Sequence, residues 1–179
     1  AVMAKKRKKS TLGLVFSAGA VLFAIAAVCM MFADAVKLVS GENVLASYKG
    51  TQVAFGYSET YPIIGEVKFL NFSFMNLLPY ILALAGAVVA LLAALSKKSF
   101  LLNIIAVACF VAAAVFFFTA ASYVSVAGSE GSGTLNVLVK NIVDALKDGD
   151  NLKIAIGSLL GGVFSIVAAA CSALKIFVK

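Results

Sequence analysis

Charged residues divide the chain into four long apolar runs separated by polar segments. Residues 10–33, 69–96, 99–129 and 154–174 contain no Asp, Glu, Lys or Arg. An α-helix rises about 1.5 Å per residue and the hydrocarbon core of a bilayer is about 30 Å thick, so each run can hold a spanning helix. The pattern predicts four transmembrane helices, over residues 10–33, 75–96, 99–123 and 154–174.

The composition favours the same interpretation. Of the 179 residues, 63% are hydrophobic and 13% are charged, and the mean hydropathy is +1.06. A soluble chain of this length has too little polar sequence to cover four such helices. We therefore expect one mainly α membrane domain, a four-helix bundle of the cell membrane in contact with lipid. Its first helix is expected to be an uncleaved signal-anchor, because the apolar run is too long for a cleaved signal.

The basic residues predict the orientation. Nine of the fifteen lie in the short segments 1–9, 97–98 and 175–179: Lys5, Lys6, Arg7, Lys8, Lys9, Lys97, Lys98, Lys175 and Lys179. Short segments rich in Lys and Arg stay in the cytoplasm, which places both termini there and segments 34–74 and 124–153 outside. Cations beside membrane spans also explain the net charge of +7 by attraction to lipid headgroups, so no nucleic-acid partner is expected.

The first outer segment, 34–74, is long enough to contain β structure. The runs 44–48 and 53–57 are rich in β-branched and aromatic residues, and Lys49-Gly50-Thr51-Gln52 separates them as a turn would. We predict a β-hairpin from these two runs and a third short strand over 66–69 that leads into the second helix. Because an isolated hairpin is marginal in water, this sheet is expected to rest on the helix ends or on a partner.

Aromatic residues are dense in this segment and form the candidate docking surface: Tyr48, Phe55, Tyr57, Tyr61 and Phe69. One interpretation is that these rings are the core of the sheet and anchor it at the membrane interface. The other is that they bind another membrane or envelope protein, or lipid, since aromatic residues often dominate the energy of an interface. The two interpretations are compatible.

The second outer segment, 124–153, predicts a short amphipathic helix. Five apolar residues follow helical spacing from position 135 to 146, while Lys140 and Asp144 lie four residues apart on the polar side. Thr134 can cap the start of this helix and Gly149 can end it. We expect the helix to lie on the outer interface or to cover the bundle.

Small residues recur every four positions in the fourth apolar run, at Gly157, Gly161, Ser165 and Ala169. Such a ridge lets another helix backbone approach closely, which drives association of helices in lipid. The partner is either another helix of the same chain, which we favour, or a second copy in a homo-oligomer.

The residue types that usually carry catalysis are scarce. The sequence has no histidine, and its three cysteines fall in three different apolar runs, where they predict small core residues. None of the charge-free runs contains an ionisable acid or base, which disfavours proton-coupled transport. We expect no cofactor or metal and no enzymatic activity. A weaker alternative is a lipid-modifying enzyme that uses the outer carboxylates Glu59, Glu66 and Asp144.

The order of elements resembles the tetraspan plan of the claudin and peripheral-myelin-type proteins: helix, long strand-bearing loop, helix, tight basic turn, helix, shorter loop, helix. The resemblance is one of topology and covers the whole chain. The tryptophan-containing motif and the cysteine pair of the first claudin loop have no counterpart in this sequence, so no functional residue is carried over. Fold likeness alone is a weak guide to function.

The sequence therefore predicts a non-enzymatic membrane protein that binds or organises partners through an aromatic outer cap. The alternative is a subunit of an oligomeric channel or transporter, assembled through the small-residue ridge of the fourth helix.

Overall fold

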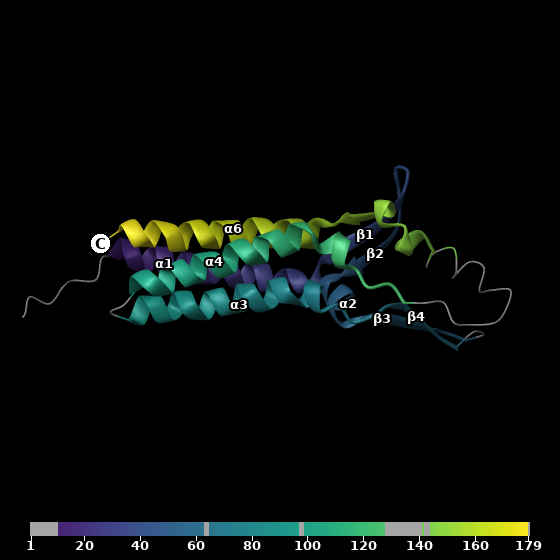
Figure 1. Cartoon of the computed structure of the whole chain (residues 1–179), viewed down its shortest axis with the longest axis horizontal. Helices are drawn as coiled ribbons and strands as arrows, with labels where there is room; N and C mark the ends of the chain where they lie inside the picture. The colour runs from purple at the N-terminus through teal and green to yellow at the C-terminus, as the bar shows by residue number, and fades with distance from the viewer. Residues whose placement is uncertain (1–10, 63–64, 97–98, 128–140, 142–143, 179) are drawn as a thin grey trace, which may run out of the picture.

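The computed structural model describes residues 11–62, 65–96, 99–127, 141 and 144–178. Four long helices lie side by side, and the β strands gather at one end of them (Figure 1). The helices are α1 (Thr11–Cys29), α3 (Phe74–Leu95), α4 (Ser99–Phe118) and α6 (Ile156–Phe177). All four are long and apolar enough to cross a membrane, with mean hydropathies from 1.9 to 2.7. The predicted mainly helical fold with four apolar helices and a small sheet is confirmed.

Small residues form the interior of the bundle. Helices α1 and α4 each pack mainly against α3 and α6, so the four helices form a closed ring. The buried cluster at its centre consists largely of alanines: Ala20, Ala24, Ala87, Ala90, Ala106, Ala168 and Ala169, together with Phe110. Large aliphatic side chains point outward instead, and Leu84 and Ile166 are 55% and 50% exposed. This arrangement suits a lipid environment, where close backbone packing rather than burial of large apolar groups holds helices together.

Two phenylalanines of α4 fit into gaps left by glycines on the neighbouring helices. A Cβ atom at Gly86 would lie 2.5 Å from Cε1 of Phe110, and one at Gly161 would lie 2.8 Å from Cε1 of Phe117. Both rings are fully buried. Any side chain at either glycine would have to displace a ring, so these glycines allow α4 to approach α3 and α6.

Two antiparallel sheets lie beyond one end of the bundle. The first has the order β2-β1-β5, built from β1 (Asp34–Ser40), β2 (Asn43–Lys49) and β5 (Leu152–Ile154). The second is a two-stranded ribbon of β3 (Tyr57–Tyr61) and β4 (Gly65–Leu70). We call these sheets, the helix α2 (Gly50–Phe55) and the described residues 120–127 and 144–155 the cap.

Backbone hydrogen bonds join the two loops that form the cap. Strand β5 of the second loop pairs with β1 of the first, with Val36 opposite Ile154. At the end of β4, the Asn71 amide donates to the carbonyl of Ser125 over 2.7 Å, and the Ala127 amide donates to the carbonyl of Phe69 over 3.0 Å. The cap is therefore one unit made from two segments far apart in the sequence.

The cap has a core of its own, made of larger side chains than the bundle interior. The buried residues of this core are Ala35, Val36, Leu38, Tyr48, Val53, Phe69, Leu70, Ala120, Leu146 and Leu152. They come from both sheets, from α2, from the 3₁₀ turn η2 (Ala120–Tyr123) and from the second loop. The polar residues of the strands, such as Ser58 and Glu66, are exposed. This is the usual distribution for a domain in water.

The cap is seated on the bundle by close backbone contacts. A Cβ atom at Gly50 would collide with the Tyr80 hydroxyl of α3. The Gly50 amide donates a hydrogen bond to the carbonyl of Ala33 over 3.1 Å. At the start of α3, the Ser73 hydroxyl donates to the carbonyl of Tyr123 over 2.7 Å. These contacts fix α2 and the strands that follow it against the ends of the helices.

The predicted hairpin of residues 44–48 and 53–57 is wrong. Residues 44–48 do lie in a strand, β2, but its partner is β1, and Gly50–Phe55 forms the helix α2. The Gln52 side chain accepts from the Lys49 amide over 2.9 Å, and Val53 and Ala54 are buried. Burial of one face of α2 thus overrides the β propensity of Val53 and Phe55. The predicted third strand, 66–69, is contained in β4.

Most of the predicted amphipathic helix, residues 134–140 and 142–143, lies outside the described residues. Its last turn, 144–147, is helical, with Leu146 buried in the cap core and Lys147 exposed. A strand that the sequence did not predict, β5, follows it and delays the start of the last helix from the expected residue 154 to Ile156. That helix then continues to Phe177, into the predicted tail.

Candidate functional site

The β3–β4 ribbon has one aromatic face and one polar face. Tyr57, Glu59 and Tyr61 alternate with Ser58 and Thr60 along β3, so the first three share a face. In the register of the ribbon, Glu59 lies opposite Val67, and Phe69 lies two residues further on the same face of β4. On the other face, the Ser58 hydroxyl donates to Oε1 of Glu66 over 2.7 Å.

The aromatic face of the ribbon forms a cleft with strand β2. The cleft has a volume of about 290 Å³ and is lined by Ala46, Ser47, Tyr48, Gln52, Tyr57, Glu59, Tyr61 and Phe69. The ring of Tyr57 stands edge-on to that of Tyr48 and stacks on that of Phe69, with centroids 6.0 Å apart in both pairs. Tyr48 and Phe69 are buried, whereas Tyr57 and Tyr61 are partly exposed at the opening.

Glu59 is the one charged residue among those that line the cleft. Its Oε2 atom accepts a hydrogen bond of 2.9 Å from the Tyr61 hydroxyl. The side chain is exposed, but its place on the strand puts it between Tyr57 and Tyr61 on the aromatic face. The cleft therefore combines aromatic walls with one carboxylate.

The three tyrosines of the cleft ionise less readily than free tyrosine. Burial is the main reason that the pKa of Tyr48 is raised, and the nearby groups Tyr57, Tyr61 and Glu59 add to it. Burial and then the Glu59 charge raise the pKa of Tyr57, while for Tyr61 the hydrogen bond to Glu59 is the main cause of its raised pKa. All three hydroxyls thus remain protonated at neutral pH, as the hydrogen bond from Tyr61 to Glu59 requires.

Four of the five predicted docking residues line the cleft, and one does not. Tyr48, Tyr57, Tyr61 and Phe69 come together there, while Phe55 lies on α2 with 57% of its surface exposed. The sequence predicted one strand that contains both Phe55 and Tyr57, but in the structure Phe55 ends the helix α2 and Tyr57 begins β3. It also missed Glu59 as part of the cleft, although the alternation of residues 57–61 places it on the same face as the two tyrosines.

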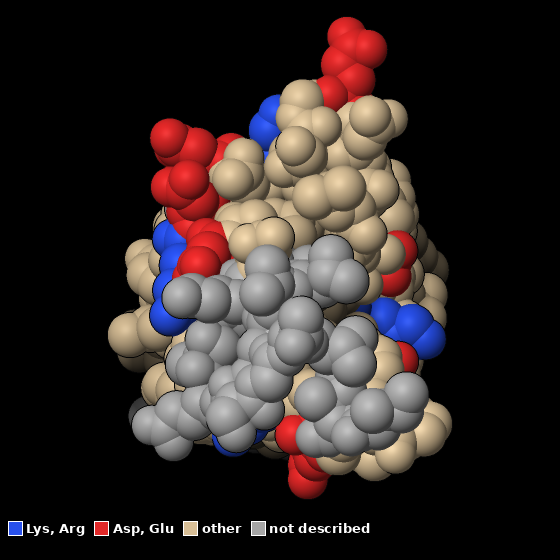
Figure 2. Space-filling model, turned by 90° about the vertical axis from the view of Figure 1, so that its right-hand side faces the viewer, with Lys and Arg blue, Asp and Glu red and all other residues tan. Residues whose placement is uncertain are grey.

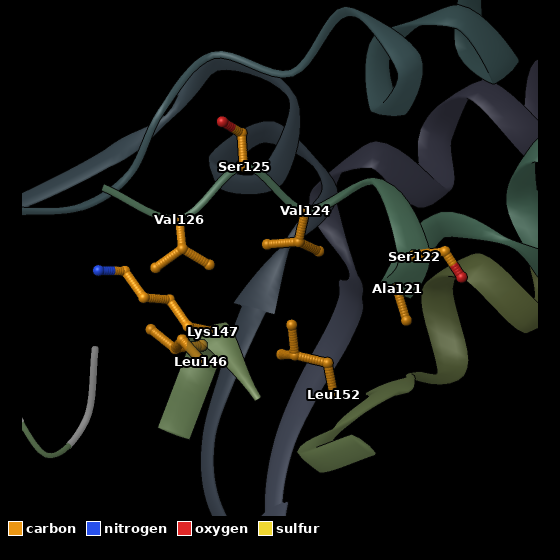
Figure 3. A pocket seen from close by; sticks show the side chains of 8 residues that line it. All are labelled: Ala121, Ser122, Val124, Ser125, Val126, Leu146, Lys147 and Leu152. Atoms are coloured by element: carbon orange, nitrogen blue, oxygen red, sulfur yellow. The ribbon is translucent and has the colours of Figure 1, made fainter. Parts of the chain in front are cut away.

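A second cavity in the cap has a volume of about 650 Å³ (Figure 3). Its lining is mostly aliphatic and comes from both parts of the second loop: Ala121, Ser122, Val124, Ser125, Val126, Leu146, Lys147 and Leu152. The amine of Lys147 lies at its margin (Figure 3). Residues 128–140 connect these two parts and lie outside the described chain, so we assign no role to this cavity.

The ridge on α6 makes its contacts within the chain. A Cβ atom at Gly157 would lie 2.7 Å from the carbonyl oxygen of Asp34, and Gly161 faces the Phe117 ring. Ser165 is fully buried and donates to the Gly161 carbonyl over 2.8 Å, and Ala169 belongs to the alanine cluster of the bundle. All four small residues of the ridge are thus covered by other parts of the same molecule.

The described residues contain no group of three or more His, Cys, Asp or Glu side chains positioned to bind a metal. Glu59 and Glu66 lie on opposite faces of the ribbon, so these two carboxylates are not combined in one site. Cys29, Cys109 and Cys171 are free thiols.

Comparison with known proteins identifies no family for this chain. No protein-family model matches the chain, and no curated protein matches it in sequence.

Proposed function

We propose that this chain is a non-enzymatic, multi-pass membrane protein that binds a partner protein through the aromatic cleft of its cap. The observation that carries the proposal is the cleft itself, in which Tyr57 and Tyr61 remain accessible above the buried Tyr48 and Phe69. Partly exposed tyrosines beside a packed aromatic base are typical of the centre of a protein interface.

In this proposal the cap lies outside the cell and both termini lie in the cytoplasm. The start of α1 and the end of α6 lie at the end of the bundle away from the cap (Figure 1). The short sequence segments 1–9, 97–98 and 175–179, which flank or end the helices, contain nine basic residues and no acid, as expected for cytoplasmic segments. The outward-facing leucines, isoleucines and valines of the bundle support contact with lipid.

The oligomeric channel has less support. The ridge proposed for its assembly lies against Phe117, Asp34 and the alanine cluster, and the buried rings of Phe110 and Phe117 lie between the helices. A pore would have to form on another surface of the helices.

Photo-cross-linking tests the proposed function. A benzophenone amino acid replaces Tyr61 in the cleft or, as the matched control, Thr60 on the opposite face of the same strand. The proposal predicts a discrete protein adduct in native membranes from position 61 that is absent or much weaker from position 60. Equal labelling from both positions, or no protein adduct from position 61, would contradict it.

A further inference from the structure

We infer that the cleft binds a basic side chain, lysine or arginine, of the partner protein. This inference rests on the proposed function and specifies the chemistry of the bound group. It is drawn from the combination of an aromatic enclosure, a carboxylate without a countercharge in the cleft, and the acidic balance of the cap.

The walls of the cleft are suited to a cation. Four aromatic residues, Tyr48, Tyr57, Tyr61 and Phe69, line a volume of about 290 Å³. Aromatic faces attract ammonium and guanidinium groups, and cages of several rings are the usual sites for alkylammonium ligands. The volume is at the lower limit of small-molecule sites, which suits one long side chain better than a larger ligand.

Glu59 supplies a charge that no residue of the cleft neutralises. Neither lysine nor arginine is present among the residues that line the cleft. Lys49 and Lys68 lie on the same strands, but they neighbour Tyr48 and Phe69 in sequence and therefore point to the opposite faces. The hydrogen bond from the Tyr61 hydroxyl orients the carboxylate without cancelling its charge. A bound cation would complete this site with a charge-assisted hydrogen bond.

The charge of the cap as a whole points to a basic partner. The two loops that form it, residues 34–74 and 124–153, contain eight acids and six lysines, a net charge of −2. Acidic side chains project at several places around the end of the molecule (Figure 2). The rest of the chain is strongly basic, since the total is +7. Complementary charge would favour the approach of a basic segment to the cap over the other end.

Titration of the full-length protein in maltoside micelles with small probes tests the inference. The probes are N-acetyl-lysine-methylamide, its uncharged norleucine analogue and phosphocholine, and the signal is tyrosine fluorescence, which is free of tryptophan background. We expect millimolar binding of the lysine probe, with at least about tenfold weaker binding of the norleucine analogue. Tighter binding of phosphocholine than of the lysine probe would overturn the inference in favour of a lipid headgroup.

Two matched variants locate the site. Glu59→Gln keeps the size of the side chain and should weaken lysine binding by about tenfold, whereas Glu66→Gln on the polar face should leave it unchanged. Equal affinities of Glu59→Gln and the parent protein would overturn the inference. If the position-61 adduct forms but the lysine probe does not bind, partner binding stands and the basic side chain is excluded. If the probe binds and no adduct forms, it is the proposed function that fails.

Discussion

The bundle and the cap have opposite distributions of large and small side chains. In the bundle, alanine, glycine and serine are buried, and leucine, isoleucine and valine face outward. In the cap, valine, leucine and aromatic residues are buried, and the charged residues face outward. The bundle follows the packing rules of helices in lipid, and the cap follows those of a domain in water. The joint at Gly50 and Tyr80 is therefore also where the environment is expected to change.

The largest expected effect is the difference in the free energy of unfolding when a leucine is changed to alanine in the cap and in the bundle. Leu38→Ala removes a fully buried side chain from the cap core and should lower the free energy of unfolding by about 2–5 kcal/mol. Leu91→Ala acts on a side chain that is 49% exposed on the bundle surface, and its effect should be below about 0.5 kcal/mol. Thermal unfolding followed by tyrosine fluorescence compares them. Equal losses would mean that the two regions do not differ.

The next largest effect is expected when an acidic residue is placed on the outer surface of the bundle and, for comparison, on the surface of the cap. Leu84→Asp places a carboxylate on the outside of α3 near its middle and should cost about 2.5–3.5 kcal/mol of membrane insertion. Thr60→Asp, opposite Glu66 on the polar face of the ribbon, should cost about 1 kcal/mol or less through repulsion between the two carboxylates. The fraction of protein that reaches the membrane measures the first effect. Normal insertion of Leu84→Asp would be incompatible with a lipid-facing surface there.

Adding one methyl group to the bundle interior should have a smaller effect. Gly161→Ala brings a Cβ atom to 2.8 Å from the Phe117 ring and should destabilise the bundle by about 1–3 kcal/mol. Gly13→Ala on α1 meets no atom within 4 Å and should be neutral or stabilising by up to about 1 kcal/mol. Thermal stability in detergent distinguishes the two variants. A tolerated Gly161→Ala would show that the contact with Phe117 is not close.

The smallest expected effect is a loss of cap stability at alkaline pH. Because the folded cap raises the pKa of Tyr48, Tyr57 and Tyr61, folding favours their neutral forms. This contribution is complete below the unfolded value of 10.0 and is lost as the pH rises through the higher folded values. Tyrosinate absorbance should therefore appear later than in unfolded protein, and Tyr48→Phe should reduce the alkaline loss. Titration of Tyr48, Tyr57 and Tyr61 at the unfolded pKa of 10.0 would contradict this expectation.

The four long apolar helices were predictable because charge-free runs of spanning length are rare outside membrane-spanning helices. The contacts that hold the helices together were not predictable. Phe110 packs against Gly86, for example, and the sequence does not reveal how these two helices are aligned with each other. The hairpin prediction failed at residues 50–55, where docking on the bundle decides the local structure. Strand β5 has three residues and depends on β1 for its hydrogen bonds, so its own sequence carries a weak signal.

The cleft was predictable in part. The aromatic residues drew attention to the correct segment, and β alternation in residues 57–61 explains why two tyrosines and Glu59 share a face. Tyr48 joins them from a different sheet, and only the fold brings these strands together. Phe55 was misplaced because the same residue points elsewhere on a helix than on a strand.

Labelling with a membrane-impermeant maleimide tests most directly the claim that the helices cross the membrane with the cap outside. Single cysteines replace Ser58 in the cap, Thr11 at the start of α1 or Phe177 at the end of α6, in a chain whose three native cysteines are changed to alanine. The account predicts labelling of position 58 on intact cells and of positions 11 and 177 only after permeabilisation. Labelling of either helix end on intact cells, with position 58 protected, would contradict it.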